Sequence, residues 1–175
     1  MLKKLEQGAL ALAGLCIVAL GLVITATVTL RNFGSGVTDD VVIVSELMVG
    51  AIFLPLSYVT ANYGHICIEF LFKRMKPPIQ LWLLAIGSMI SLLILCPLAF
   101  AAWIDFSHAV DAGAYFFGEL ELPEWPGRFA FLLGAVLFVL RLSVICVADI
   151  HAALSGNVGY LVQRDAAEND IVEEG

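Results

Sequence analysis

Four long apolar stretches constrain the fold of this 175-residue chain more than any other feature of its sequence. They run over residues 7–30, 41–61, 79–104 and 127–148. As a helix, the first stretch rises about 36 Å, which is enough to cross a hydrocarbon core about 30 Å thick. Only helices and closed barrels satisfy their backbone hydrogen bonds in lipid, and these stretches are continuous rather than alternating. We therefore predict an all-α membrane protein with four transmembrane helices.

The composition agrees with this fold and leaves little chain for anything else. Hydrophobic residues make up 61% of the sequence, and the mean hydropathy is +0.95. The four spans and their connections use most of the chain, so we predict a single membrane domain over residues 1–175 and no soluble domain. Lys3 and Lys4 could head a secretory signal, but the apolar run is too long and no small-residue cleavage site closes it. We expect an uncleaved first helix.

Basic residues near the predicted spans indicate the orientation of the chain, because they favour the cytoplasmic side. Arg31 and Arg128 fall on one side. The larger group falls on the other side and consists of Lys3, Lys4, Lys73, Arg74, Lys76 and Arg164. We therefore expect both termini in the cytoplasm, with a short acidic cytoplasmic tail over residues 164–175.

The connection between the third and fourth spans then lies outside, and it is acidic. It carries Glu119, Glu121 and Glu124. Aromatic residues suited to the headgroup boundary flank these carboxylates, namely Tyr115, Phe116, Phe117 and Trp125. Because the formal net charge of the whole chain is −7, we expect no nucleic acid as a partner.

An amphipathic segment follows the second span. His65, Glu69 and Lys73 recur at intervals of four residues, while apolar side chains cover the other faces. Pro77 and Pro78 then stop the helix before the third span begins. We predict a cytoplasmic interfacial helix over residues 64–76 that lies along the phospholipid surface. The alternative is a solvated connector with incidental spacing.

Arg141 stands alone in the fourth apolar stretch, where a charge needs protection from lipid. At intervals of seven residues it shares one helix face with three small residues, Gly127, Gly134 and Ala148. Small residues permit close packing of helices. We hypothesise a buried ion pair between Arg141 and either Asp149 or Glu69. The alternative is that the long Arg141 side chain extends to the cytoplasmic surface.

Glu46 is the charge within the second stretch. A proton or sodium relay usually contains several intramembrane carboxylates, and only Asp105 lies at comparable depth. Helix packing or a contact to a partner subunit is therefore favoured for Glu46. Neither the second nor the third span has the broken, polar-lined core of a transporter substrate site, so we expect no substrate-binding residue.

Catalytic and metal-binding motifs are absent from the sequence, and we expect no enzyme and no metal site. The cysteines do not form the closely spaced outer pair that a quinone-reducing disulfide oxidase needs. Cys67 falls on the cytoplasmic side, and the other three lie within the predicted spans, at Cys16, Cys96 and Cys146.

Two other functions stay open at this point. His65 and His151 both come at the cytoplasmic ends of spans, which is compatible with a haem or quinone anchor of an oxidoreductase, although axial ligands normally point inward from within helices. A small stand-alone channel or exporter is the second alternative.

The order of these features resembles the small membrane subunit of tripartite ATP-independent periplasmic (TRAP) transporters over nearly the whole chain. The resemblance is carried by four spans with both ends inside, an acidic residue early in the second span, and two sequence segments. Residues 63–71 read Tyr-Gly-His-Ile-Cys-Ile-Glu-Phe-Leu, and residues 122–126 read Leu-Pro-Glu-Trp-Pro. In the family, a histidine followed by a hydrophobic and an acidic residue leads into a short leucine-rich helix and a basic, proline-containing stop. Here the matching residues are His65, Ile68, Glu69, Lys73, Arg74 and Pro77.

The resemblance implies a subunit of a sodium-coupled secondary transporter for organic acids in the bacterial inner membrane. A large multi-span subunit would carry substrate and sodium, and a periplasmic binding protein would deliver the substrate. This chain would bind no cofactor and would brace the large subunit. Its candidate structural or partner-contact residues are Glu46, His65, Glu69, Gly134, Arg141 and Asp149. The outer loop with Glu119, Glu121 and Glu124 would help to dock the binding protein; alternatively, these carboxylates only keep the loop solvated.

Overall fold

The computed structural model describes residues 2–34, 37–61 and 75–164 of this chain. Within these ranges it contains four helices that are long and apolar enough to cross a membrane and no β-strand. The prediction of an all-α membrane protein with four spanning helices is therefore confirmed. The predicted interfacial helix falls almost entirely outside the described residues, as do His65, Glu69 and the acidic tail after Arg164.

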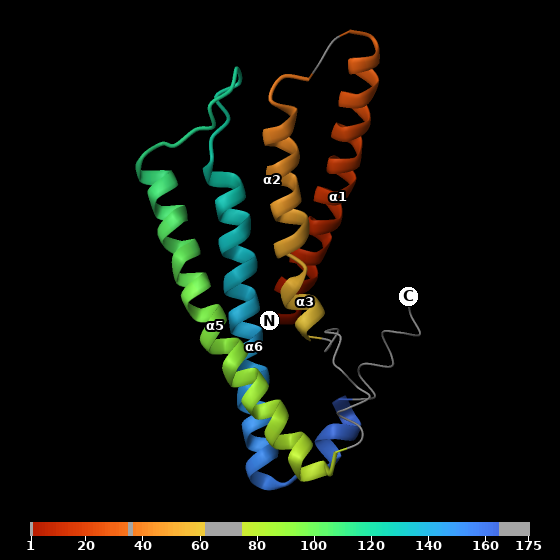
Figure 1. Ribbon diagram of the computed structural model, residues 1–175, viewed down its shortest axis with the longest axis vertical. Helices are drawn as coiled ribbons and strands as arrows, with labels where there is room; N and C mark the ends of the chain where they lie inside the picture. The colour runs from red at the N-terminus through yellow and green to blue at the C-terminus, as the bar shows by residue number, and fades with distance from the viewer. Residues whose placement is uncertain (1, 35–36, 62–74, 165–175) are drawn as a thin grey trace. The chain divides into compact units, whose positions relative to one another are not determined.

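The apolar stretches of the sequence form helices that extend beyond them. These helices are α1 (Leu2–Asn32), α2 (Asp40–Phe53), α3 (Leu56–Ala61), α5 (Pro77–Asp111) and α6 (Trp125–Ser155) (Figure 1). The stretches over 7–30, 79–104 and 127–148 lie within α1, α5 and α6, and the stretch over 41–61 corresponds to α2 and α3. Gly156 ends α6 with φ +63°, and a short helical turn follows over residues 159–164.

Proline affects two of these helices differently. α2 ends at Phe53, a turn contains Pro55, and α3 begins at Leu56. Proline lacks a backbone N–H and its ring clashes with the carbonyl group of the preceding helical turn, so a break at Pro55 is expected. Pro97, in contrast, lies inside α5, which continues through it.

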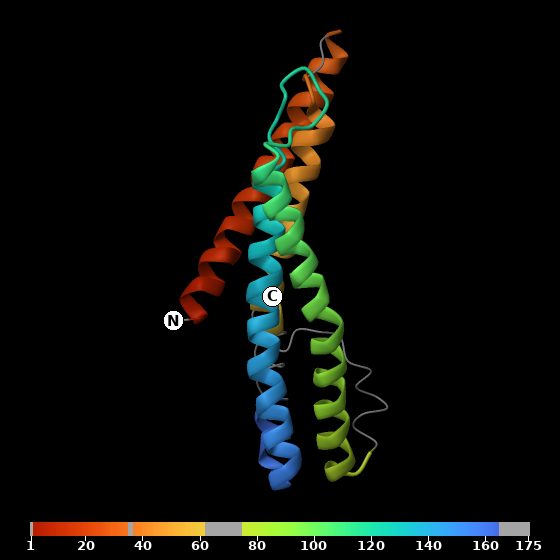
Figure 2. The same cartoon turned by 90° about the vertical axis from the view of Figure 1, so that its left-hand side faces the viewer.

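The chain forms two compact units, and the first, here called unit 1, contains residues 1–56 and 98–136. In unit 1, α1 and α2 lie side by side (Figures 1 and 2). A Cβ atom at the buried Gly50 of α2 would lie 3.1 Å from the Sγ atom of Cys16 in α1. The absence of a side chain at Gly50 therefore lets the two helices approach closely.

The second compact unit, unit 2, contains residues 57–97 and 137–175. Its apolar core joins the beginning of α5 with the end of α6 and the turn that follows. Leu81 and Ala85 come from α5, and Ala152 and Ala153 come from α6. Leu161 comes from the short helical turn over residues 159–164, here called the terminal turn. This core explains why the chain reverses after Gly156, because the reversal brings Leu161 back to α6.

The connection between α5 and α6, residues 112–124, belongs to unit 1 and is called the hairpin below. The Phe116 N–H donates to the Leu122 carbonyl at 2.8 Å, and the Glu124 N–H donates to the Ala114 carbonyl at 3.0 Å. Tyr115 and Pro123 form an isolated β-bridge between its two arms. Figure 1 shows the hairpin edge-on, and Figure 2 shows it as an open loop. Backbone hydrogen bonds therefore fix its conformation.

Large apolar side chains remain exposed along α1 and α5. Leu15 and Leu22 of α1 are more than half exposed, as are Trp82, Leu93 and Trp103 of α5. Extensive apolar exposure of this kind is typical of helices that face lipid or another subunit.

Candidate functional site

Two glycines bring α6 close to α2 within unit 1. Gly127 and Gly134 are both buried and lie seven residues apart, hence on nearly the same face of α6. A Cβ atom at Gly134 would lie 2.5 Å from the backbone oxygen of Phe53, and a Cβ atom at Gly127 would overlap the carboxylate of Glu46. A larger residue at Gly134 would have to displace the backbone of α2, whereas one at Gly127 would have to move the side chain of Glu46. Gly134 thus lies at a close contact of α6 with α2, and its predicted role as a structural or partner-contact residue stays a prediction.

An aromatic contact accompanies these glycines. The rings of Phe53 in α2 and Phe131 in α6 lie 4.5 Å apart at 86°, which is an edge-to-face arrangement. Such pairs stabilise packing by about 0.5–1.5 kcal/mol beyond the area that they bury. The ring of Phe131 thus packs against α2 at a position between the two glycines.

Glu46 interacts with the beginning of α6. Its carboxylate contacts the backbone N–H of Gly127 and lies in the field of Arg128. The first N–H groups of a helix have no partner within the helix, and the helix dipole makes this end positive. α6 has no acidic residue in its own first turn, so α2 provides the carboxylate. This geometry agrees with the helix-packing interpretation of Glu46.

Arg128 interacts with two carboxylates, those of Glu124 and Asp105, at the same end of unit 1. Its Nη2 and Nε atoms donate to Glu124 Oε2 at 2.7 and 3.2 Å, and its Nη1 atom lies 3.6 Å from Asp105 Oδ2. A cavity of about 230 Å³ lies beside this cluster and is lined by Glu46, Val49, Phe53, Asp105, Phe116, Gly127, Arg128 and Phe131. Asp105 and Glu46 thus line one cavity, but a guanidinium group lies among the carboxylates and neutralises part of their charge.

Asp149 of unit 2 is a buried carboxylate, at 2% exposure. The Tyr160 hydroxyl donates to Asp149 Oδ1 at 2.7 Å, and Arg164 Nη1 lies 3.4 Å from the same oxygen. Asp149 therefore fastens the terminal turn to α6. The sequence predicted Asp149 as a partner of Arg141, a role that stays a prediction, and no sequence pattern indicates Tyr160, which follows the break at Gly156.

Arg141 is half-buried in α6. Of its two candidate partners, Asp149 bonds to Tyr160 and Arg164, and Glu69 lies outside the described residues. The ion pair of Arg141 therefore stays a prediction.

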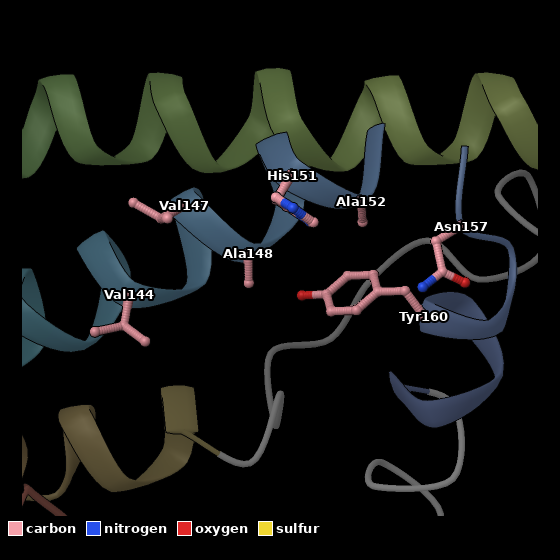
Figure 3. Close-up of a pocket in the computed structure, with 7 residues that line it drawn as sticks. All are labelled: Val144, Val147, Ala148, His151, Ala152, Asn157 and Tyr160. Carbon is pink, nitrogen blue, oxygen red and sulfur yellow. The ribbon is translucent and has the colours of Figure 1, made fainter. Parts of the chain in front are cut away.

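An open cavity of about 360 Å³ lies beside the Asp149 cluster in unit 2 (Figure 3). Its lining is mostly apolar and consists of Val144, Val147, Ala148, His151, Ala152, Asn157 and Tyr160. Figure 3 shows the Tyr160 ring reaching from the terminal turn toward Ala148 and Ala152 of α6. His151 is exposed, and the residues that the structure describes bring no second histidine into the lining. Nor do they contain a group of three His, Cys, Asp or Glu side chains that could hold a metal ion.

The three carboxylates of the hairpin differ in their surroundings. Glu119 and Glu121 are exposed, whereas Glu124 is bonded to Arg128 at 2.7 Å and its side chain is 20% exposed. Only Glu119 and Glu121 therefore have carboxylates that are largely open to a partner.

Asp39 holds the hairpin to the start of α2, although no sequence pattern indicates this role. Its Oδ2 atom accepts a hydrogen bond from the Leu120 N–H at 2.8 Å, and a Cβ atom at Gly118 would overlap its carboxylate. An acidic residue before a helix usually caps that helix. Asp39 instead has φ 56° and makes no side-chain cap, so its carboxylate is directed at the hairpin.

Glu6 is a second residue that the sequence analysis did not single out. It lies at the beginning of α1 and is 1% exposed. Its spacing to Ala9 and Ala13, which are also buried, is the helical three-and-four spacing that places all three on one face. This spacing is the signal by which the sequence identifies Glu6 as a buried residue.

Comparison with known proteins identifies a family. The family model described as "Tripartite ATP-independent periplasmic transporters, DctQ component" matches residues 20–151 of this chain. The matched region contains Glu46, Gly127, Gly134, Arg141 and Asp149. No curated protein and no solved structure matches the chain.

Proposed function

The chain belongs to the DctQ family and is a small membrane subunit of a tripartite ATP-independent periplasmic (TRAP) transporter, and we propose that it braces the large transport subunit of that transporter in the membrane. Membership in this family implies partnership with a large membrane subunit and a binding protein. The chain is thus a multi-pass membrane component of a transport system.

The observation that carries this proposal is the α2–α6 contact of unit 1. Gly134 packs against the backbone of Phe53, and Gly127 packs against the carboxylate of Glu46. A helix pair that moves during transport needs two alternative packings of similar energy. A backbone contact at Gly134, together with a polar interaction of Glu46 at the beginning of α6, favours one packing and suits a static support.

The distribution of polar groups also supports a structural role for this chain rather than a substrate pathway through it. Glu46, Asp105 and Arg128 surround a cavity of about 230 Å³ in unit 1, and Asp149 bonds to Tyr160 and Arg164 in unit 2. Arg128 and Asp149 have charged or hydrogen-bonding partners within their units, whereas the Oε2 atom of Glu46 is buried without a hydrogen-bond partner among the residues that the structure describes. Substrate pathways in transporters are instead formed by discontinuous helices with polar groups that face the ligand.

In the proposed assembly, the large subunit carries an organic acid together with sodium, and a periplasmic binding protein delivers the substrate. The chain lies in the bacterial inner membrane with both termini in the cytoplasm, so that the hairpin faces the periplasm. The exposed Glu119 and Glu121 then contribute to docking the binding protein by steering a basic surface toward it.

Affinity purification of the chain from its native membrane in mild detergent, with mass spectrometry and an absorbance spectrum, tests the proposal. We expect a colourless complex with one large multi-span protein. A Soret band or a co-purified flavin or iron–sulfur protein would instead assign the chain to an oxidoreductase. A pure homo-oligomer that transports solute alone after reconstitution would identify a channel or exporter.

A matched pair of variants links this assembly to the glycine contact. Gly134→Ala should lower the yield of the complex and its transport rate, because the added methyl group displaces α2. Gly87→Ala is the control, because Gly87 also lies inside a long helix but a Cβ atom there meets nothing within 4 Å. Equal yields and rates for both variants would contradict the bracing role of the contact.

A further inference from the structure

An open groove of about 600 Å³ lies between the hairpin and the ends of α5 and α6, entirely within unit 1. Val110 of α5 forms one wall, Tyr115 and Pro123 come from the two arms of the hairpin, and Trp125 begins α6. Glu121 is the charged residue among the lining residues. The groove thus combines two aromatic side chains with one carboxylate.

The hairpin holds these groups in place. Tyr115 and Pro123 are paired in the β-bridge, and the arms are joined by the hydrogen bond from Phe116 N–H to the Leu122 carbonyl. Glu121 has φ 44°, a left-handed conformation that glutamate rarely adopts and that the surrounding hydrogen bonds must enforce. The groove is therefore formed by a fixed backbone rather than by side chains alone.

The chemistry of the lining selects a cation. Faces of tyrosine and tryptophan attract ammonium groups, and a nearby carboxylate adds charge attraction. Further carboxylates are close in sequence, at Asp111 and Glu119. Arg128 is already engaged with Glu124 and Asp105. The lining therefore favours an ammonium group over an anion.

The position of the groove identifies the source of that ammonium group. Tyrosine and tryptophan at the ends of spanning helices lie at the level of the lipid headgroups. Val110 is 52% exposed, and Trp103, two turns earlier on the same face of α5, is 57% exposed. This apolar face continues from the groove toward the middle of the span, where an acyl chain can lie.

We propose that this groove binds the headgroup of an ammonium-bearing phospholipid, phosphatidylethanolamine or phosphatidylcholine, from the leaflet on the hairpin side. Tyr115 and Trp125 contact the ammonium group, Glu121 supplies the negative charge, and the exposed face of α5 with Val110 and Trp103 takes the acyl chain. This site is independent of the bracing function, and it shares Glu121 with the proposed docking surface for the binding protein.

Native mass spectrometry of the purified full-chain complex, delipidated and then supplied with defined lipids, tests the proposal. Phosphatidylethanolamine and phosphatidylcholine should be retained about three- to tenfold better than phosphatidylethanol, which lacks the ammonium group. Glu121→Gln should lower this preference at least twofold, and the attraction of Tyr115 and Trp125 for the ammonium group should account for the remainder. Glu119→Gln is the control, because Glu119 is an exposed hairpin carboxylate outside the groove lining, and it should leave the preference unchanged. Equal retention of all three lipids by the native chain, or equal effects of the two variants, would overturn the proposal.

A fluorescence measurement makes the test independent of Glu121 variants. In the variant Trp82→Phe/Trp103→Phe, Trp125 is the remaining tryptophan, and a phospholipid with a nitroxide-labelled choline headgroup should quench it. Unlabelled phosphatidylethanolamine should relieve the quenching at several-fold lower concentration than phosphatidylethanol. Equal relief by both lipids would overturn the proposal. So would relief by a soluble lysine peptide but not by phosphatidylethanolamine, which would assign the groove to a protein side chain.

Discussion

The two compact units stabilise their polar groups in different ways. In unit 1, Glu46 reaches a backbone N–H of α6, and Arg128 bonds to carboxylates while its own side chain stays 39% exposed. In unit 2, the Asp149 side chain is 1% exposed and its partners are the side chains of Tyr160 and Arg164. A buried charge with few partners depends on each of them, whereas a partly exposed cluster is compensated by its surroundings.

Removal of a charge partner in unit 2 should produce the largest effect. Of the Asp149 partners that the structure describes, Arg164→Met leaves the Tyr160 hydroxyl. We expect the free energy of unfolding to fall by about 3 kcal/mol, which is the lower end for breaking a buried ion pair. Unfolding in a titration of denaturing detergent measures it. The double variant Asp149→Leu/Arg164→Met should recover most of the loss. If the double variant is no better than Arg164→Met, the loss comes from packing rather than from the stranded charge.

A substitution at the glycine contact of unit 1 should have the second-largest effect on the free energy of unfolding. Gly134→Ala places a methyl group 2.5 Å from the Phe53 carbonyl oxygen, and such overpacking costs about 1–3 kcal/mol. Gly87→Ala should instead stabilise the chain by about 0.5–1 kcal/mol, because alanine favours a helix interior and no atom obstructs it. The same detergent titration compares the two. Stabilisation by both variants would show that α2 yields to the methyl group.

Removal of the Glu46 charge should lower the free energy of unfolding less than Arg164→Met or Gly134→Ala does. Glu46→Gln keeps an oxygen for the Gly127 N–H but removes the negative charge from the positive end of α6, which should cost about 0.5–1 kcal/mol. Glu119→Gln in the exposed hairpin is the matched control and should cost nothing measurable. If Glu46→Gln lowers the free energy of unfolding as much as Arg164→Met does, the two units do not differ in how strongly their charges depend on single partners.

Asp105 should give the smallest effect. Its side chain is 65% exposed and its distance to Arg128 Nη1 is 3.6 Å, so Asp105→Asn should cost less than about 0.5 kcal/mol. What cost there is should vanish at high salt, because exposed charges are screened. A cost above 1 kcal/mol that persists in about 1 M salt would mean that Asp105 is shielded from solvent by a partner subunit.

The spanning helices could be predicted because their signal is local. Each apolar stretch is long enough for one crossing, and the interruption by Pro55 follows from the chemistry of one residue. The position of Gly134 on one face of α6 with Gly127 could also be predicted, because it follows from their seven-residue spacing. These features depend on residues that are near one another in the chain.

The contacts of the candidate site depend on residues that are far apart in sequence or separated by a break. Asp39 and Leu120 are 81 residues apart, and no pattern on either side identifies the other. Tyr160 follows the reversal at Gly156, so its helical register relative to Asp149 cannot be extrapolated along α6. Such pairings are determined by tertiary packing, which a single sequence does not display.

The contact between α2 and α6 also sets an order for biogenesis. Phe53 and Glu46 are synthesised long before Gly127 and Gly134, so during translation α2 enters the bilayer without the helix that covers it. Until α6 inserts, Glu46 lacks the backbone N–H of Gly127 and faces an environment in which an ionised carboxylate is costly. A nascent chain that stalls before α6 therefore carries a carboxylate without its Gly127 partner.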